Sequence, residues 1–389
     1  MKYLIQKYLL LISAILISGN LYSKPETEYF YFNKISAFSS LSSFYVKTMV
    51  QDSTGYIWIA TSDGLNRYDG HEIKVYKAYD GKENLGLVSG TIQELLLDSK
   101  DRLWVGTPIG ISLYNKEFDK FEIIASITEE NGLESFDIKN IFEDKDENIY
   151  VATGTLIYRF DEENGIFKKV FTVREESISR ILFDKESGGF WVGYFEGAGI
   201  DFYSSFDSKE PKYTISVKES PTSIFNMVKF NGQIWAALGE EGAVIFDAES
   251  GANISRIFNK PGERNHVINF RIDKQGRLWL MDFSGIKRYR PETNDYKEYY
   301  TYQELHYSLR PNTVDIFEDN QGNFYSLHNG GGVYVSLLEV GFDLINTSDT
   351  FFWHLNNPNI SAIAQDKDDN LWLGSFNGGI DIFKWKENK

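Results

Sequence analysis

The stretch VKTMVQDSTGYIWIATSDGLNRYD, from Val46 to Asp69, decides the fold of this chain. Apolar residues alternate up to Asp52 and again from Trp58, which is typical of two short strands that flank a tight turn. An aspartate at the start of such a turn accepts hydrogen bonds from backbone amides two residues on, and a glycine such as Gly55 adopts the positive φ that the turn requires. The stretch therefore predicts a β-hairpin, and a second turn at Gly64 predicts a third strand.

The same pattern occurs eight times along the chain, with successive central aromatic residues 41 to 47 positions apart. A fourth, edge strand follows the third, as in the segment HEIKVYKAY. A repeat of this length over nearly the whole chain predicts a β-propeller of four-stranded blades, in which the aromatic residue packs between neighbouring blades. The central aromatic residues are Trp58, Trp104, Tyr150, Trp191, Trp235, Trp279, Tyr325 and Trp372.

The eight copies allow two arrangements. We favour seven blades over residues 24–338, with the segment at 28–36 as the strand that closes the ring, because closure removes exposed sheet edges. Residues 339–389 are then an eighth repeat that begins an interrupted second propeller. The alternative is a closed eight-bladed propeller in which the eighth repeat is the closing blade.

The first 23 residues differ in character from the repeats. Lys2 and Lys7 precede a short apolar run, and Ser23 is a small residue at a plausible cleavage site. This pattern predicts a signal peptide over residues 1–23 and a periplasmic or secreted protein. The formal net charge of −16 disfavours nucleic acid as a partner.

Motifs for catalysis, cofactors and metals are absent from the sequence. The chain has no cysteine, and its five histidines occupy non-equivalent places in the repeat. The acidic runs at 144–148 and 366–370 lack the glycine and glutamate that a calcium loop needs at its sixth and twelfth positions, and both coincide with the turn of the repeat. We therefore predict a binding protein with no catalytic residue, no metal site and no cofactor.

The connections between second and third strands vary more than the framework, and a propeller brings them together on one face. Loops on a rigid scaffold are the usual place for function. Aromatic rings suit the C–H faces of sugars, and carboxylates or amides suit their hydroxyl groups. The predicted ligand-binding residues are Tyr194, Phe195, Glu196, Glu240, Asp282, Phe283, His328, Asn329 and Phe376. Of the histidines, we expect only His328 to face a central pocket.

The segment QDSTGYIWIATSDGLNRYDG, together with its copies over roughly residues 28–385, resembles the two-component regulator propeller repeat of Bacteroidetes hybrid sensor kinases. In that family the periplasmic part holds two seven-bladed propellers and a small β-sandwich, followed by a membrane helix and cytoplasmic kinase modules. The resemblance implies a periplasmic sensor that recognises glycan fragments. The chain ends at Lys389 without these later modules, which implies a sensor that lacks its own kinase output.

The implied partners are an oligosaccharide and either a membrane sensor kinase or the missing second propeller. Two other classes of function stay open from the sequence. One is a polysaccharide-degrading or lyase-type propeller enzyme, and the other is a protein-interaction scaffold.

Overall fold

The computed structural model describes residues 32, 35–78, 86–126, 133, 137–217, 223–257, 266–282, 285–299, 312–336, 357, 359–367, 370–376 and 378–383. The chain divides into two compact units, Met1–Leu337 and Leu338–Lys389. The described residues form antiparallel β-sheets and one short 3₁₀ helix, so the predicted all-β fold is confirmed. No helix among them has the length and apolar character needed to cross a membrane.

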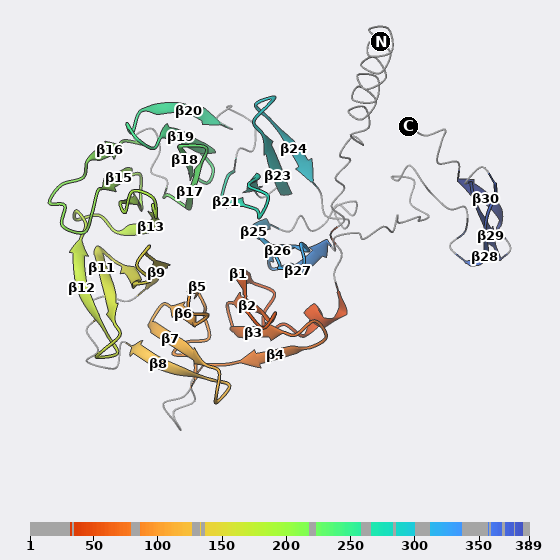
Figure 1. The fold of residues 1–389 in the computed structure, drawn as a ribbon, viewed down its shortest axis with the longest axis horizontal. Coiled ribbons are helices and arrows are strands. Elements are labelled where there is room, and N and C mark those ends of the chain that lie inside the picture. The colour runs from red at the N-terminus through yellow and green to blue at the C-terminus, as the bar shows by residue number, and fades with distance from the viewer. Residues whose placement is uncertain are drawn as a thin grey trace, which may run out of the picture. The chain divides into compact units, whose positions relative to one another are not determined.

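The first unit is a ring of seven sheets (Figure 1). The first strand of each sheet lies nearest the centre and contacts the first strand of the next sheet, and β25 contacts β1. The ring therefore closes through seven blades, as the favoured arrangement predicted. The inner strands are β1 (Val46–Gln51), β5 (Glu94–Leu97), β9 (Ile138–Glu143), β13 (Ile178–Phe183), β17 (Asn226–Phe230), β21 (Asn269–Ile272) and β25 (Asn312–Glu318).

Each sheet continues outward in chain order, with antiparallel pairing throughout. The second strands are β2 (Ile57–Thr61), β6 (Leu103–Thr107), β10 (Ile149–Thr153), β14 (Phe190–Tyr194), β18 (Gln233–Ala237), β22 (Leu278–Asp282) and β26 (Phe324–Asn329). The third strands are β3 (Gly64–Tyr68), β7 (Gly110–Asn115), β11 (Leu156–Asp161), β15 (Ile200–Tyr203), β19 (Ala243–Asp247), β23 (Gly285–Arg290) and β27 (Gly332–Ser336). The outer strands are β4 (Ile73–Tyr76), β8 (Lys120–Ser126), β12 (Ile166–Thr172), β16 (Tyr213–Ile215), β20 (Asn253–Ile257) and β24 (Asp295–Tyr299).

The turn aspartate of the repeat holds both the turn and the aromatic residue. In the first blade, one carboxylate oxygen of Asp52 accepts hydrogen bonds from the amides of Thr54 and Tyr56, both at 3.0 Å, and the other accepts from Trp58 Nε1 at 2.8 Å. Blades two, three, six and seven and the eighth repeat make the same aspartate-to-aromatic bond. In the fifth blade, where Lys229 lies six residues before Trp235, the buried indole nitrogen has no partner among the described residues.

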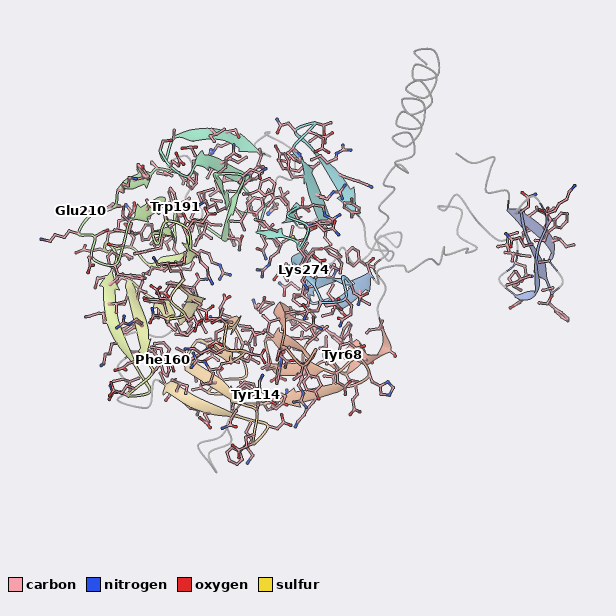
Figure 2. The ribbon with its side chains drawn as sticks, viewed as in Figure 1. Tyr68, Tyr114, Phe160, Trp191, Glu210 and Lys274 are labelled. Atoms are coloured by element: carbon pink, nitrogen blue, oxygen red, sulfur yellow. The ribbon has the colours of Figure 1, made fainter. Side chains whose placement is uncertain are left out.

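Side chains pack into the spaces between neighbouring sheets (Figure 2), as Trp191 does between the fourth and fifth blades. Small residues two positions after the aromatic allow this approach. A Cβ atom on Gly193 would lie 2.6 Å from the side chain of Ile224 in the next blade, so only glycine fits there.

Main-chain and side-chain bonds join the last blade to the first. The carbonyl of Phe44 accepts hydrogen bonds from the amides of Gly330 and Gly332, each at 3.1 Å, and Gln51 Oε1 accepts from the amide of Asn320 at 2.6 Å. Most of the predicted closing segment at 28–36 lies outside the described residues, so the closing strand stays a prediction. Within it, Phe32 is buried, and Ser36 begins the 3₁₀ helix η1 (Ser36–Ser40).

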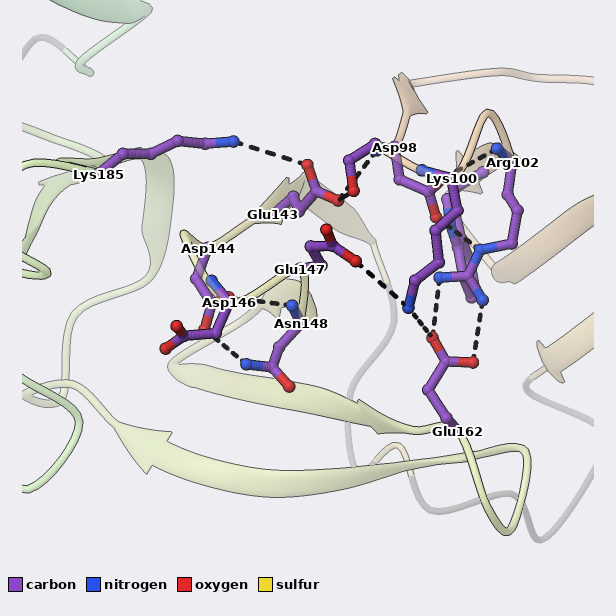
Figure 3. A network of polar contacts seen from close by, with 12 residues as sticks. Asp98, Lys100, Arg102, Glu143, Asp144, Asp146, Glu147, Asn148, Glu162 and Lys185 are labelled. Carbon is purple, nitrogen blue, oxygen red and sulfur yellow. Dashed lines mark hydrogen bonds and ion pairs between the residues drawn. The ribbon is translucent and has the colours of Figure 1, made fainter.

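Neighbouring blades also share polar contacts at the face that carries the aspartate turns (Figure 3). Glu143 of the third blade accepts hydrogen bonds from the amide and hydroxyl of Ser99 in the second, and its other oxygen lies 3.6 Å from Lys185 Nζ in the fourth. Arg102 of the second blade donates to Glu162 of the third. These contacts link the second, third and fourth blades on this face.

The second unit contains one three-stranded sheet of β28 (Ile360–Gln365), β29 (Leu371–Ser375) and β30 (Gly379–Phe383). Trp372 is 38% exposed, whereas its counterpart Trp58 in the ring is fully buried. Ile363, Phe376, Ile380 and Ile382 of the same unit are exposed as well. The predicted signal peptide, residues 1–23, lies outside the described residues.

Candidate functional site

A cleft of about 610 Å³ opens between the third and fourth blades. Because neighbouring strands alternate in direction, the connections between second and third strands lie on the same face as the connections from one blade to the next. The cleft is on this face, and its size is in the range of small-ligand sites. It is lined by Asp137, Lys139, Gly154, Glu175, Glu176, Ser177, Ile178, Phe195 and Glu196.

Backbone hydrogen bonds between and within the two blades hold the walls of the cleft. The amide of Ile178 donates to the carbonyl of Gly154 at 2.8 Å, and the amide of Phe195 donates to the carbonyl of Ser177 at 3.1 Å. Gly154 has a φ of +57°, which the tight turn between β10 and β11 requires. The walls are thus tied to the rigid ends of strands.

One side of the cleft combines an aromatic ring with an ammonium group. Lys139 Nζ lies 5.0 Å from the centroid of the Phe195 ring, a cation–π distance, and 2.6 Å from a carboxylate oxygen of Asp137. Gln93 Nε2 donates to the other oxygen of Asp137 at 2.8 Å. Burial would raise the pKa of Asp137, but the hydrogen bonds from Lys139 and Gln93 hold that pKa below its usual value. Asp137 is therefore ionised and positions the ammonium group.

The rim of the cleft also carries the exposed carboxylates of Glu175, Glu176 and Glu196. An ionised carboxylate offers several acceptor positions and no donor, so this rim suits a ligand rich in hydroxyl or ammonium donors. With Asp137 and Lys139 included, the lining carries four acidic groups and one basic group. A polyanionic ligand would meet repulsion here.

Two of the nine predicted site residues, Phe195 and Glu196, line this cleft. Glu196 has a φ of +55° in the turn after β14, which directs the chain back into β15. These two residues form a loop, as the sequence predicted, and they are the part of the predicted set that the structure brings together.

Three other predicted residues have buried side chains with partners inside the protein. The hydroxyl of Tyr194 donates to Asp201 at 2.9 Å, and burial raises the pKa of Tyr194. Asp282 lies 2.8 Å from Lys287 Nζ. His328 is fully buried in β26, with its ring nitrogens 2.9 Å and 3.4 Å from two hydroxyl oxygens, rather than at the surface of a pocket.

Of the four remaining predicted residues, three are described by the structure, and they are not among the residues that line the cleft. Glu240 is exposed, with a carboxylate oxygen 3.9 Å from His266 Nε2, and Asn329 forms an isolated β-bridge with Tyr45. Phe376 is 68% exposed in the second unit, and Phe283 lies outside the described residues.

Sequence reasoning missed most of the cleft because it considered only the connections inside each blade. Glu175, Glu176 and Ser177 lie between the third and fourth blades, and Lys139 lies near the start of β9. The available signal was the segment REES at 174–177, which departs from the repeat just before its fourth copy.

Comparison with known proteins bears on the repeat and the fold. Residues 354–377 match the family model of the two component regulator propeller. A 54-residue stretch is 37% identical to histidine kinase P4 of Formosa agariphila, which corresponds to 14% of this chain and 4% of that protein. The resemblance of the repeat to the two-component regulator propeller is therefore confirmed.

Solved structures share the propeller fold at low sequence identity. The extracellular domain of a putative hybrid two component system from B. thetaiotaomicron aligns with a TM-score of 0.70 and 22% identity, over 92% of this chain and 48% of that one. This chain thus spans about half the length of that domain. Streptogramin B lyase aligns with a TM-score of 0.60 and 12% identity, over 79% of this chain and 96% of that one.

Proposed function

We propose that this chain, whose repeat is that of the two component regulator propellers, is an extracytoplasmic sensor propeller that binds glycan fragments in the cleft between its third and fourth blades. The observation that carries the proposal is the cleft itself, which is lined by the ring of Phe195 together with several carboxylates. The repeat family and the shared fold with the extracellular domain of a two component system support the sensor role.

In the proposed complex the sugar makes two kinds of contact with the cleft. The C–H face of one ring stacks on Phe195, and its hydroxyl groups donate to the carboxylates of Glu175, Glu176 and Glu196. Because acidic groups outnumber basic ones in the lining, a neutral oligosaccharide binds more tightly than a uronate-rich or sulfated one. Lys139 is available to an acceptor oxygen of the ligand.

We further propose that a partner on the extracytoplasmic side of the membrane binds the ligand-bound form of the propeller. This partner is either a membrane sensor kinase or a second propeller. The exposed apolar residues of β28–β30 support a role for residues 339–389 as the first blade of such a propeller. We also propose that residues 1–23 direct export of the chain and are then removed as a signal peptide.

An enzyme of the lyase type is the alternative, and its support is the shared fold with streptogramin B lyase. Among the residues that the structure describes, those that line the cleft include no histidine and no tyrosine, and they offer carboxylates and one lysine for acid–base chemistry. The ring of Phe195 and these carboxylates are sufficient for stacking on a sugar and for hydrogen bonds with its hydroxyl groups. The lining therefore favours a binding protein over an enzyme.

Isothermal calorimetry of the full chain against neutral, uronate-rich and sulfated oligosaccharides tests the proposal. We expect reversible binding of a neutral oligosaccharide, and chromatography of the sugar afterwards should show unchanged material. New reducing ends or unsaturated products would assign the protein to the enzymes. Binding only of anionic sugars would contradict the proposed recognition.

A further inference from the structure

The inner strands carry one equivalent residue each at the centre of the ring. It lies two positions before the residue that pairs with the aromatic of the repeat. All seven side chains are polar, although the strands are otherwise rich in apolar residues. We call these residues the hub: Thr48, Glu94, Asn140, Arg180, Asn226, Asn269 and Asp315. The eighth repeat has Ala362 at this position.

Hub residues bind the backbone of the following inner strand. Asn140 Oδ1 accepts from the amide of Ile181 at 2.8 Å, and Asn226 Oδ1 accepts from the amide of Phe270 at 3.3 Å. Asn269 Nδ2 donates to the carbonyl of the next strand at 2.9 Å. The three asparagines of the hub therefore each reach one blade forward.

Arg180 reaches three other blades. Its Nε donates to the carbonyl of Phe225 in the fifth blade at 2.8 Å. Its NH1 group donates to the carbonyl of Lys139 in the third blade at 3.0 Å and to the carboxylate of Glu94 in the second at 2.9 Å. Because Arg180 itself lies on β13, one guanidinium group joins four consecutive blades around the cleft.

The two carbonyl groups that Arg180 holds belong to segments beside the cleft. Lys139 is the residue whose ammonium lies over Phe195. Phe225 follows Ile224, whose amide donates to the carbonyl of Tyr194 directly before Phe195. Arg180 thus fixes the backbone on both sides of the aromatic ring, while Arg180 itself is not among the residues that line the cleft.

We propose that Arg180 is the positioning residue of the ligand cleft, which it sets by holding the main chain at Lys139 and Phe225 in register. This inference rests on the proposed function for its link to a ligand. A planar guanidinium group serves three acceptors at fixed angles, whereas the ammonium of lysine is a single point charge on a flexible stem. The role therefore depends on the shape of the arginine head and not only on its charge.

Arg271 is a matched control within the hub region. It makes two hydrogen bonds of 2.6 Å to the carboxylate of Asp315 in the next blade, so it pairs with a carboxylate of another blade as Arg180 does with Glu94. Among the described residues it has no hydrogen bond to a main-chain carbonyl. Replacement of Arg271 should cost stability without loosening the cleft.

The test compares Arg180→Lys with Arg271→Lys and Glu94→Gln in the full chain. The first readout is amide hydrogen exchange without ligand, followed in peptides that cover 137–141 and 223–227, the segments whose carbonyl groups Arg180 holds. We expect exchange in these peptides to accelerate about tenfold in Arg180→Lys, since a hydrogen bond from a charged donor is lost at each wall. Glu94→Gln keeps an acceptor for the guanidinium and should leave exchange near that of the wild type.

The second readout is calorimetric affinity for whichever neutral oligosaccharide the wild type binds. The dissociation constant should rise about tenfold in Arg180→Lys and stay unchanged in the other two variants. Unchanged exchange in Arg180→Lys, or equal acceleration in Arg271→Lys, would overturn the positioning role. Absence of binding by the wild type would refute the proposed function instead, and the exchange measurement would still decide the role of Arg180.

Discussion

The bond between the turn aspartate and the repeat aromatic allows a direct stability comparison within one molecule. The indole N–H of Trp58 donates a hydrogen bond to the buried carboxylate of Asp52 at 2.8 Å. Trp235 occupies the equivalent place in the fifth blade and is also buried, but its indole nitrogen has no partner among the described residues. Replacing either tryptophan by phenylalanine removes the same atoms from an interface between blades.

The two replacements therefore share the cost of a smaller side chain and differ in one hydrogen bond. Loss of volume in a packed interface costs roughly 1–3 kcal/mol in each case. A hydrogen bond to a charged group contributes about 1.5–3 kcal/mol. We expect Trp58→Phe to lower the free energy of unfolding by about 1.5–3 kcal/mol more than Trp235→Phe does.

Urea unfolding followed by circular dichroism at pH 7 measures this difference, and an unchanged dependence on urea concentration shows that both variants unfold like the wild type. Equal losses in the two variants would refute the reasoning. A larger loss in Trp235→Phe would show that packing, and not the aspartate, sets the contribution of the repeat aromatic.

Three further predictions concern other parts of the chain. A chain that ends at Leu338 should melt at the same temperature as the full chain, because the ring closes through seven sheets without the second unit, and strong destabilisation would contradict this. Burial opposes ionisation of Asp119, but hydrogen bonds from Lys74, Tyr114 and Tyr76 hold its pKa well below the usual value. Asp119→Asn should therefore destabilise the protein at pH 7, and this effect should be lost progressively as the pH falls below about 4. A difference in urea midpoint between variant and wild type that persists at low pH would contradict this. N-terminal sequencing of exported protein should start near Lys24, and recovery of intact Met1 would exclude removal of the signal peptide.

The sequence predicted the fold because each blade repeats the same short-range signals. The alternation before Asp52 and after Trp58 specifies two strands, and the aspartate between them specifies the turn. What the repeat alone did not reveal is the bond from the aspartate to the indole nitrogen, although the constant spacing of six residues was visible. The absence of that aspartate before Trp235 is the sequence signal for the unpaired nitrogen in the structure.

The candidate site was harder to predict because its residues depend on where strands end. Tyr194, Asp282 and His328 were assigned to loops, yet each pairs in the ladder of its own sheet. Continued pairing carries these side chains into the core. The cleft also depends on contacts between blades, such as the one from Ile178 to Gly154, and a repeat pattern within one blade contains no information about them.

The most direct test of the proposed cleft is a calorimetric titration of the best neutral oligosaccharide against Phe195→Ala and Phe118→Ala. Phe195 lines the cleft, whereas Phe118 is a 62% exposed phenylalanine in the turn between β7 and β8 on the opposite face. Loss of one stacked ring should cost about 1–2 kcal/mol, so the dissociation constant of Phe195→Ala should rise roughly 5- to 30-fold. Phe118→Ala should bind like the wild type. Equal affinity of both variants and the wild type would contradict a glycan site in this cleft.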